Sequence, residues 1–269
     1  MPTVASGTPP RADTEGRVVL LAGPGESTEV VANFLASRVP ELVVIMEDPP
    51  SRLRMVKRRA RKLGWLAVTG QLLFIVFALP ILRRRATRRV HDILRAASVD
   101  TTPREPDSRV PSINDAQVVR LITSLRPAMV VVNGTRIIAT PVLESAGCPV
   151  VNLHAGITPR YRGVHGGYWA LAERHPEWVG STVHLVDTGI DTGGILGQTV
   201  FEITGEDSFA TYPSLHLVHG LPLLGAQVDQ VMAGAALAPR PMGLAPGSRL
   251  YYHPTLWGYL RRRWRDGVR

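Results

Sequence analysis

Short apolar runs alternate with amphipathic stretches along most of this chain. The runs are bounded by glycine, proline or charged residues, which is typical of buried β-strands. They lie at residues 18–22, 42–46, 128–132, 150–153, 182–186 and 195–203. Helical periodicity is found at residues 27–38, 113–125 and 165–174, and Asn114 and Asp115 are suited to cap the second of these helices. Residues 107–113 are predicted to be mostly a connector.

Such an order of strands and helices predicts an α/β fold with a doubly wound, mostly parallel sheet of the Rossmann-like type. Ligands bind to these sheets just beyond the carboxyl ends of the strands. We therefore expect the functional residues to follow strands rather than to lie within helices.

Residues 49–97 interrupt the pattern. A basic stretch at 52–62 is followed by 20 uncharged residues at 63–82 and by a second basic stretch at 83–89. Twenty apolar residues suffice to cross a bilayer. A span would, however, divide one sheet between two sides of a membrane, and its basic flanks lack the usual asymmetry. We therefore favour helices that pack on the domain or form a homodimer. Peripheral contact with an anionic membrane surface is the alternative, and a true span is the least favoured interpretation.

Composition and charge limit the possible domain organisation and the possible partners. The chain has 269 residues and 45% hydrophobic content, which is ample for one large domain, and its single cysteine excludes an intrachain disulfide. The net charge is +9, yet residues 52–89 carry 12 of the 31 basic residues and no acidic one. We expect a disordered tail at 1–16, a catalytic domain at 17–205 with a helical insertion at 49–97, and a helical extension at 206–269. The tail has no signal-peptide core, which indicates a cytoplasmic protein.

Polar residues with a chemical role follow two of the predicted strands. Asn152 and His154 are one residue apart near the end of a strand, so their side chains should leave on the same face. Asp191 lies in a glycine-rich loop after the strand at 182–186. An amide and an imidazolium can bind an oxyanion, while a carboxylate can hold the imidazole charged or accept a proton. This set predicts acyl transfer, and no metal site is expected.

Two motifs in the right order resemble those of the folate-dependent formyltransferases. The first is Asn-Leu-His at 152–154, continuing to Tyr-Arg-Gly at 161–163, and the second is Thr-Val-His-Leu-Val-Asp-Thr-Gly-Ile-Asp at 182–191. The stretch at 130–138 is similar to the strand and folate-contacting loop of that family. The resemblance implies a formyltransferase fold and transfer of a formyl group from 10-formyltetrahydrofolate to an amine.

The resemblance also implies roles for individual residues. The catalytic set would be Asn152, His154 and Asp191. The residues expected to bind the folate donor are Arg136, Ile137, Ile138, Val186, Asp187, Gly189 and Ile190. The residues expected on the acceptor side are Gly23, Gly25, Tyr161, Arg162, Gly163 and His184. The Gly23 loop departs from a good phosphate site because Pro24 lacks a donor and Glu26 is anionic.

These motifs do not determine which amine accepts the formyl group. About 65 residues after Gly205 are fewer than the nucleic-acid-binding domain of methionyl-tRNA formyltransferases needs, so nucleic acid is not the expected partner. A small-molecule amine leads, with a nucleotide-linked amino sugar or a membrane-proximal amine as the candidates. The alternative is a non-catalytic protein of the same fold that binds a membrane surface or nucleic acid through its basic segments.

Overall fold

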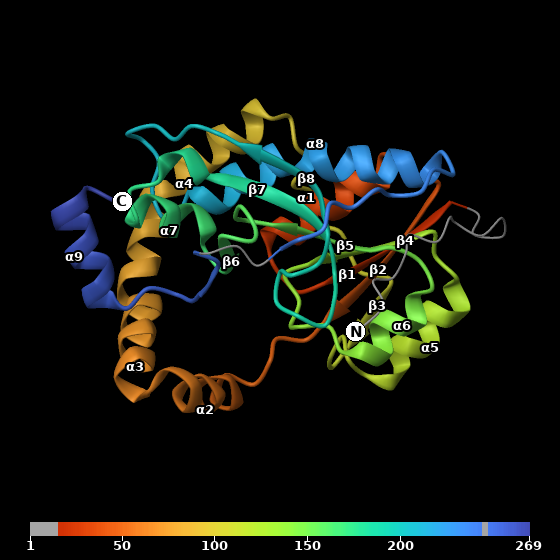
Figure 1. Ribbon diagram of the computed structural model, residues 1–269, viewed down its shortest axis with the longest axis horizontal. Helices are drawn as coiled ribbons and strands as arrows, with labels where there is room; N and C mark the ends of the chain where they lie inside the picture. The colour runs from red at the N-terminus through yellow and green to blue at the C-terminus, as the bar shows by residue number, and fades with distance from the viewer. Residues whose placement is uncertain (1–15, 244–246) are drawn as a thin grey trace.

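The computed structural model describes residues 16–243 and 247–269, so all but the last residue of the expected tail at 1–16 lies outside the described residues. A seven-stranded sheet has the order β3-β2-β1-β4-β5-β7-β8 (Figure 1). Its strands are β1 (Arg17–Ala22), β2 (Glu41–Glu47), β3 (Ser108–Val110), β4 (Met129–Asn133), β5 (Val150–His154), β7 (Gly180–Leu185) and β8 (Ile195–Val200). The pairs from β3 to β5 are parallel, whereas β5–β7 and β7–β8 are antiparallel. The predicted mostly parallel α/β fold is confirmed.

Helices cover both faces of this sheet. They are α1 (Glu26–Ala36), α5 (Ala116–Leu125), α6 (Thr140–Ala146), α7 (Gly166–Ala172), the short 3₁₀ helix η2 (Pro176–Trp178) and α8 (Tyr212–Met232). Alternation along β1 sends Val18 and Leu20 into the core beneath α1 and α8, while Val19 and Leu21 pack beneath α5 and α6. Asp115 caps α5 by accepting the backbone N–H of Gln117, as the sequence predicts. The strand β8 ends at Val200, before the end of the apolar run at 195–203 that predicts it.

The insertion between β2 and β3 is helical, as expected. It consists of α2 (Arg52–Leu63), α3 (Trp65–Leu73), the π-helical segment η1 (Phe74–Ala78) and α4 (Leu79–Ala96). The last three form one continuous helix, Trp65–Ala96, which is long and apolar enough to cross a membrane. The extension at the other end of the chain adds β9 (Arg249–Tyr251) and α9 (Leu256–Asp266), and β9 pairs with β6 (Tyr161–Gly163) in a small second sheet. Figure 1 shows α9 beside α3 and α2 below the sheet edge.

Phe74 connects the insertion to the rest of the molecule. Its ring is fully buried, 4.9 Å from that of Phe209 and 5.1 Å from that of Tyr259. Phe74→Ala should therefore lower the free energy of unfolding by about 3–5 kcal/mol, as cavity-forming Phe substitutions do. The neighbouring Phe77 is 60% exposed, so Phe77→Ala is the matched control and should change stability by less than about 0.5 kcal/mol. Chemical denaturation of both variants measures the difference, and equal losses would contradict this packing role.

Candidate functional site

The two neighbouring strands β5 and β7 bring the predicted polar residues together. Their antiparallel register sets Asn152 opposite His184 and His154 opposite Thr182. Because side chains alternate along a strand, Asn152 and His154 share one face. The Asn152 Nδ2 atom lies 3.2 Å from His184 Nε2, and His184 Nδ1 lies 2.7 Å from the Leu185 carbonyl oxygen. The Leu185 carbonyl fixes a proton on His184 Nδ1, and Nε2 lies within reach of both the Asn152 amide and the Asp191 carboxylate.

Asp191 connects the two histidines. Its Oδ2 atom lies 3.5 Å from His154 Nδ1, and its Oδ1 atom lies 3.5 Å from His184 Nε2. The backbone N–H of Gly163 donates to Oδ2 at 2.7 Å. Asp191 adopts a φ of 50°, in the left-handed region that Asp tolerates better than most residues. The carboxylate is thereby held between both imidazoles and a backbone donor.

The electrostatics of this network favour an ionised Asp191. Burial opposes the charged form, but His154, His184 and the Gly163 N–H together lower the pKa of Asp191 to about 2. Burial lowers the pKa of His154, while Asp191 and the Tyr161 carbonyl act in the opposite direction. The His154 Nε2 atom lies 2.8 Å from that carbonyl oxygen, so it carries the proton of the neutral ring. The sequence predicts a protonated His154, but burial disfavours that charge, and the route proposed below starts from the neutral ring.

These residues lie in the wall of a cavity of 530 Å³. Asn152, His154, His184 and Asp191 all contribute to its lining. Every residue that the resemblance implies for folate binding lines it too, namely Arg136, Ile137, Ile138, Val186, Asp187, Gly189 and Ile190. The structure thus gathers the catalytic and folate sets around one space, as the carboxyl ends of β4 and β5 predict.

Glu47 supports the loop at 134–138 and was not identified from the sequence. It ends β2, is 4% exposed, and accepts the backbone N–H groups of Ile113 at 2.9 Å and Arg136 at 2.7 Å. It also forms an ion pair with the Arg136 side chain. A glutamate that directly follows an apolar strand was the available signal. Its carboxylate fixes the cavity-lining loop that is predicted to bind the folate donor.

We expect Glu47→Gln to weaken binding of a stable 10-formyltetrahydrofolate analogue by about tenfold, or 1.4 kcal/mol. The amide would keep one oxygen as an acceptor but turn its NH2 group toward one of the two backbone N–H groups that now meet a carboxylate. Asp48→Asn is the matched control because the Asp48 side chain is exposed beside the same loop. Calorimetric titration of both variants measures the effect. Unchanged affinity in Glu47→Gln would remove Glu47 from the support of this loop.

The residues expected on the acceptor side do not all line the cavity. Tyr161 and Arg162 do not belong to the cavity lining. The Tyr161 ring is buried and stacks on Tyr251, so its contribution is the carbonyl that holds His154. The Arg162 guanidinium donates to the Ile190 carbonyl and to Ser248. Only Gly163 and His184 of the acceptor set face the cavity.

Gly156 packs directly against the His154 ring. A Cβ atom there would lie 2.8 Å from His154 Nε2 and 2.6 Å from the Tyr161 carbonyl oxygen. Glycine therefore leaves room for the contact that positions the imidazole. The Ala-Gly pair at 155–156 is compatible with the chemistry predicted for His154.

Gly23 and Gly25, expected on the acceptor side, do not line this cavity. The Gly23 N–H donates to the Asn133 carbonyl, and its own carbonyl accepts the Thr28 hydroxyl. The end of β1 also approaches the loop after β4 closely. This approach requires glycine, since a Cβ at 23 would lie 2.3 Å from the Gly134 carbonyl oxygen. These contacts describe a strand-to-helix turn, and phosphate binding there stays a prediction.

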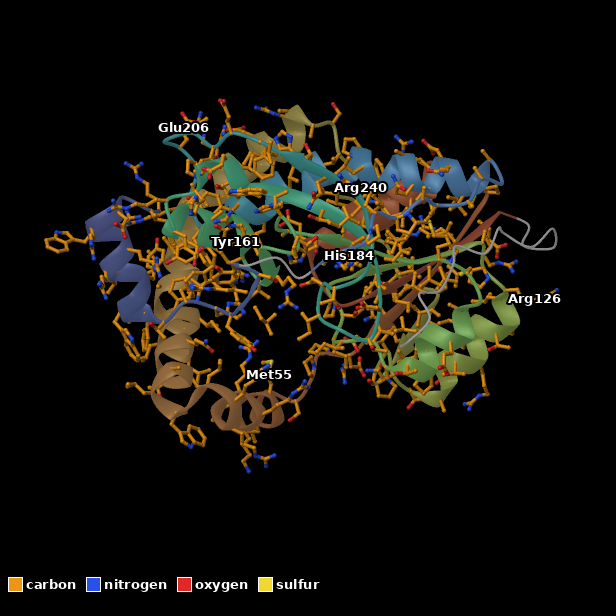
Figure 2. All side chains as sticks on the ribbon, in the orientation of Figure 1. Met55, Arg126, Tyr161, His184, Glu206 and Arg240 are labelled. Carbon is orange, nitrogen blue, oxygen red and sulfur yellow. The ribbon has the colours of Figure 1, made fainter. Side chains whose placement is uncertain are left out.

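The insertion supplies one wall of the cavity, which the sequence did not indicate. The α2 residues in this wall are Met55, Arg58, Arg59, Lys62 and Leu63, and residues 250–253 next to β9 complete it. Figure 2 shows Met55 on the side of α2 that is turned toward the sheet, where His184 lies. Burial lowers the pKa of Arg59. Among the described residues, no carboxylate forms an ion pair with Arg58, Arg59 or Lys62, and no cluster of three potential metal ligands occurs.

A family model and characterised relatives match the part of the chain that carries the motifs. The family model described as formyl transferase matches residues 85–215, just under half of the chain. A methionyl-tRNA formyltransferase from Pelotomaculum thermopropionicum is 34% identical over 129 residues, which cover 48% of this chain and 40% of that protein. The chain thus spans well under two thirds of the length of this relative. The resemblance to formyltransferases is confirmed.

Two solved structures share the fold. Glycinamide ribonucleotide transformylase 1 from Symbiobacterium toebii superposes with a TM-score of 0.54 and 18% identity, covering 90% of this chain and all of that one. An N-formyltransferase from Helicobacter canadensis, solved in complex with folinic acid and dTDP-3-aminofucose, gives a TM-score of 0.52 and 15% identity. That match covers 87% of this chain and 70% of the other. At these identities the likeness establishes the fold alone.

Proposed function

We propose that this chain, whose residues 85–215 match the formyl transferase family, transfers a formyl group from 10-formyltetrahydrofolate to a small-molecule amine in the cytoplasm. The observation that carries this proposal is the network of Asn152, His154, His184 and Asp191 within one cavity wall. The folate-side loops at 134–138 and 186–190 line the same cavity. The folinic acid bound by the Helicobacter canadensis protein is consistent with a folate donor here.

The chemistry requires an oxyanion donor. Attack of the amine nitrogen on the formyl carbon converts the carbonyl oxygen into an oxyanion and forms a tetrahedral intermediate. The Asn152 amide nitrogen carries two hydrogens, and the His184 ring accepts one of them. We assign the second to the oxyanion, because it belongs to a side chain in the cavity wall that is already oriented by its neighbour.

The proton of the attacking amine needs an acceptor. A neutral His154 beside the ionised Asp191 is suited to take it, and the resulting imidazolium would be stabilised by the carboxylate and by the developing oxyanion. When the intermediate collapses, the bond from the formyl carbon to N10 breaks, and the His154 imidazolium gives its proton to N10 and returns to the neutral form. The products are the N-formylated amine and tetrahydrofolate, and the proton count balances.

The cavity also indicates what kind of amine fits. Arg58, Arg59 and Lys62 from α2 place positive charge opposite the catalytic network. Such a wall favours an acceptor that carries a phosphate or another anionic group. A nucleotide-linked amino sugar and a membrane-proximal phosphorylated amine both satisfy this requirement. A free, uncharged amine would leave the basic wall without a partner.

The test is calorimetric titration of the purified protein with a stable 10-formyltetrahydrofolate analogue, followed by a screen of phosphorylated and neutral amines for formyl transfer. Micromolar binding together with transfer to a phosphorylated amine is the expected result. Arg58→Ala should raise KM for that amine without changing the Kd of the analogue. Failure of a folded wild type to bind the analogue would overturn the proposal and favour a non-catalytic protein of this fold.

A further inference from the structure

One side of the long helix exposes apolar residues to solvent. Only 22% of the residues in the most apolar window of Trp65–Ala96 are buried. The exposed apolar side chains along it are Trp65, Leu66, Leu72, Val76, Phe77 and Ile81, with exposed fractions between 39% and 77%. Leu72 and Val76 are four residues apart, as are Phe77 and Ile81, so these four side chains form a stripe rather than isolated positions. An exposed stripe of this size indicates an interaction surface.

The helix α9 widens this stripe. Trp257, Leu260 and Trp264 are spaced by three and four residues and are 44%, 53% and 89% exposed. The helix lies beside α3 (Figure 1). Gly70 permits that approach, since a Cβ there would lie 2.4 Å from the Trp257 ring. We call the six residues of the long helix and these three of α9 the apolar surface.

Basic residues surround the apolar surface. Those with exposed side chains outside the cavity lining are Lys57 and Arg61 on α2, Arg83, Arg84, Arg85 and Arg88 on α4, and Arg261, Arg263 and Arg265 on α9. No acidic residue occurs between Asp48 and Asp92 in the sequence. Apolar and aromatic side chains bordered by arginine and lysine match the boundary between anionic lipid headgroups and acyl chains.

The opposite side of the same helix is occupied by protein. Phe74, Gln71 and Ala86 are buried against the domain, and the strands before and after the insertion, β2 and β3, are parallel neighbours in one sheet. A spanning helix would place the segments before and after it on opposite sides of the bilayer. The pairing of β2 with β3 in one sheet excludes this arrangement. A symmetric pairing of two copies through the apolar surface would bring like charges together, which disfavours a dimer there.

We propose that the apolar surface docks this protein onto an anionic membrane, with its apolar residues in the headgroup boundary and the surrounding arginines on lipid phosphates. The elements that wall the cavity continue directly into this surface. The helix α2 runs into α3 at Gly64, and residues 250–253 lead into α9. If the proposed formyl transfer holds, the docked cavity faces amines carried by phosphorylated amphiphiles at the membrane.

Vesicle flotation tests the docking without relying on catalysis. The full-length protein should float with phosphatidylcholine vesicles that contain phosphatidylglycerol, and not with phosphatidylcholine alone. Added salt should reduce the bound fraction, because it screens the arginines. Val76→Glu should weaken vesicle binding by at least about tenfold. Val200→Glu on the edge strand β8 is the matched control, since Val200 and Val76 are 60% and 58% exposed.

Several results would overturn the docking proposal. They are no flotation at low salt, equal flotation with neutral vesicles, equal losses in both glutamate variants, or a dimer in sedimentation that Val76→Glu dissociates. Titration of the same preparations with the folate analogue separates the two proposals. Binding of the analogue without binding of vesicles would support the formyltransferase function and contradict membrane docking. Binding of vesicles without binding of the analogue would support docking alone.

Discussion

Asn152→Ala should lower kcat for formyl transfer by about 10²–10³, as the loss of one oxyanion donor does in other acyl-transfer sites. The affinity for the folate analogue should change little, because the proposed hydrogen bond strengthens only as negative charge develops on the formyl oxygen. Steady-state kinetics with the best amine from the screen, paired with calorimetry, measures both quantities. Asn152→Asp should lose more activity than Asn152→Ala, since it brings a carboxylate to the position of the oxyanion.

Whether the Asn152→Ala substitution changes kcat or KM shows which role the Asn152 amide has. A higher KM with unchanged kcat would mean that the amide binds ground state and transition state equally, which would contradict the oxyanion assignment. Asn33→Ala is the control for substitution of an amide outside the cavity, because Asn33 belongs to α1 and bonds only to the connector at 100–102. It should leave both parameters unchanged.

Local patterns were sufficient to predict the sheet and the centre of the site. Strands β1, β2, β4, β5 and β7 are apolar runs bounded by turn residues, and their carboxyl ends carry the motifs. The shared face of Asn152 and His154 follows from strand alternation alone. The pairing of Asn152 with His184 does not, because it depends on the antiparallel register between β5 and β7. That register is a tertiary property, set by how distant segments pack.

The remainder of the site depends on contacts between segments far apart in the chain. The insertion looked like an addition to the domain, yet α2 folds back to wall the cavity with Arg58 and Arg59. Tyr161 looked like a substrate contact, whereas its ring packs on Tyr251, about ninety residues later in the sequence, and only its carbonyl reaches His154. Neither position follows from periodicity or charge, because the Tyr161 ring is placed by the pairing of β6 with β9, and α2 by its return to the cavity wall.

Asp191→Asn should lower kcat by about 10²–10⁴, the range typical of a lost acid–base group. It should also shift the titration of His154. The Asp191 charge raises the pKa of that imidazole against the lowering effect of burial, so its removal should move the His154 midpoint to still lower pH. NMR titration of the His154 ring protons in both proteins measures this shift without any acceptor.

The loop that carries Asp191 offers its own control. Asp187 also lines the cavity, but its carboxylate is bound to the Gly189 N–H and the Thr192 hydroxyl rather than to an imidazole. Asp187→Asn should therefore leave the His154 midpoint unchanged and cost less than about tenfold in kcat. The neutral His154 accepts the amine proton in the proposed route, so activity of the wild type should fall as pH drops through the His154 pKa, which lies below 6.5. A His154 midpoint that rises in Asp191→Asn, or equal kinetic losses in the two variants, would contradict the carboxylate–imidazole pair as the proton acceptor.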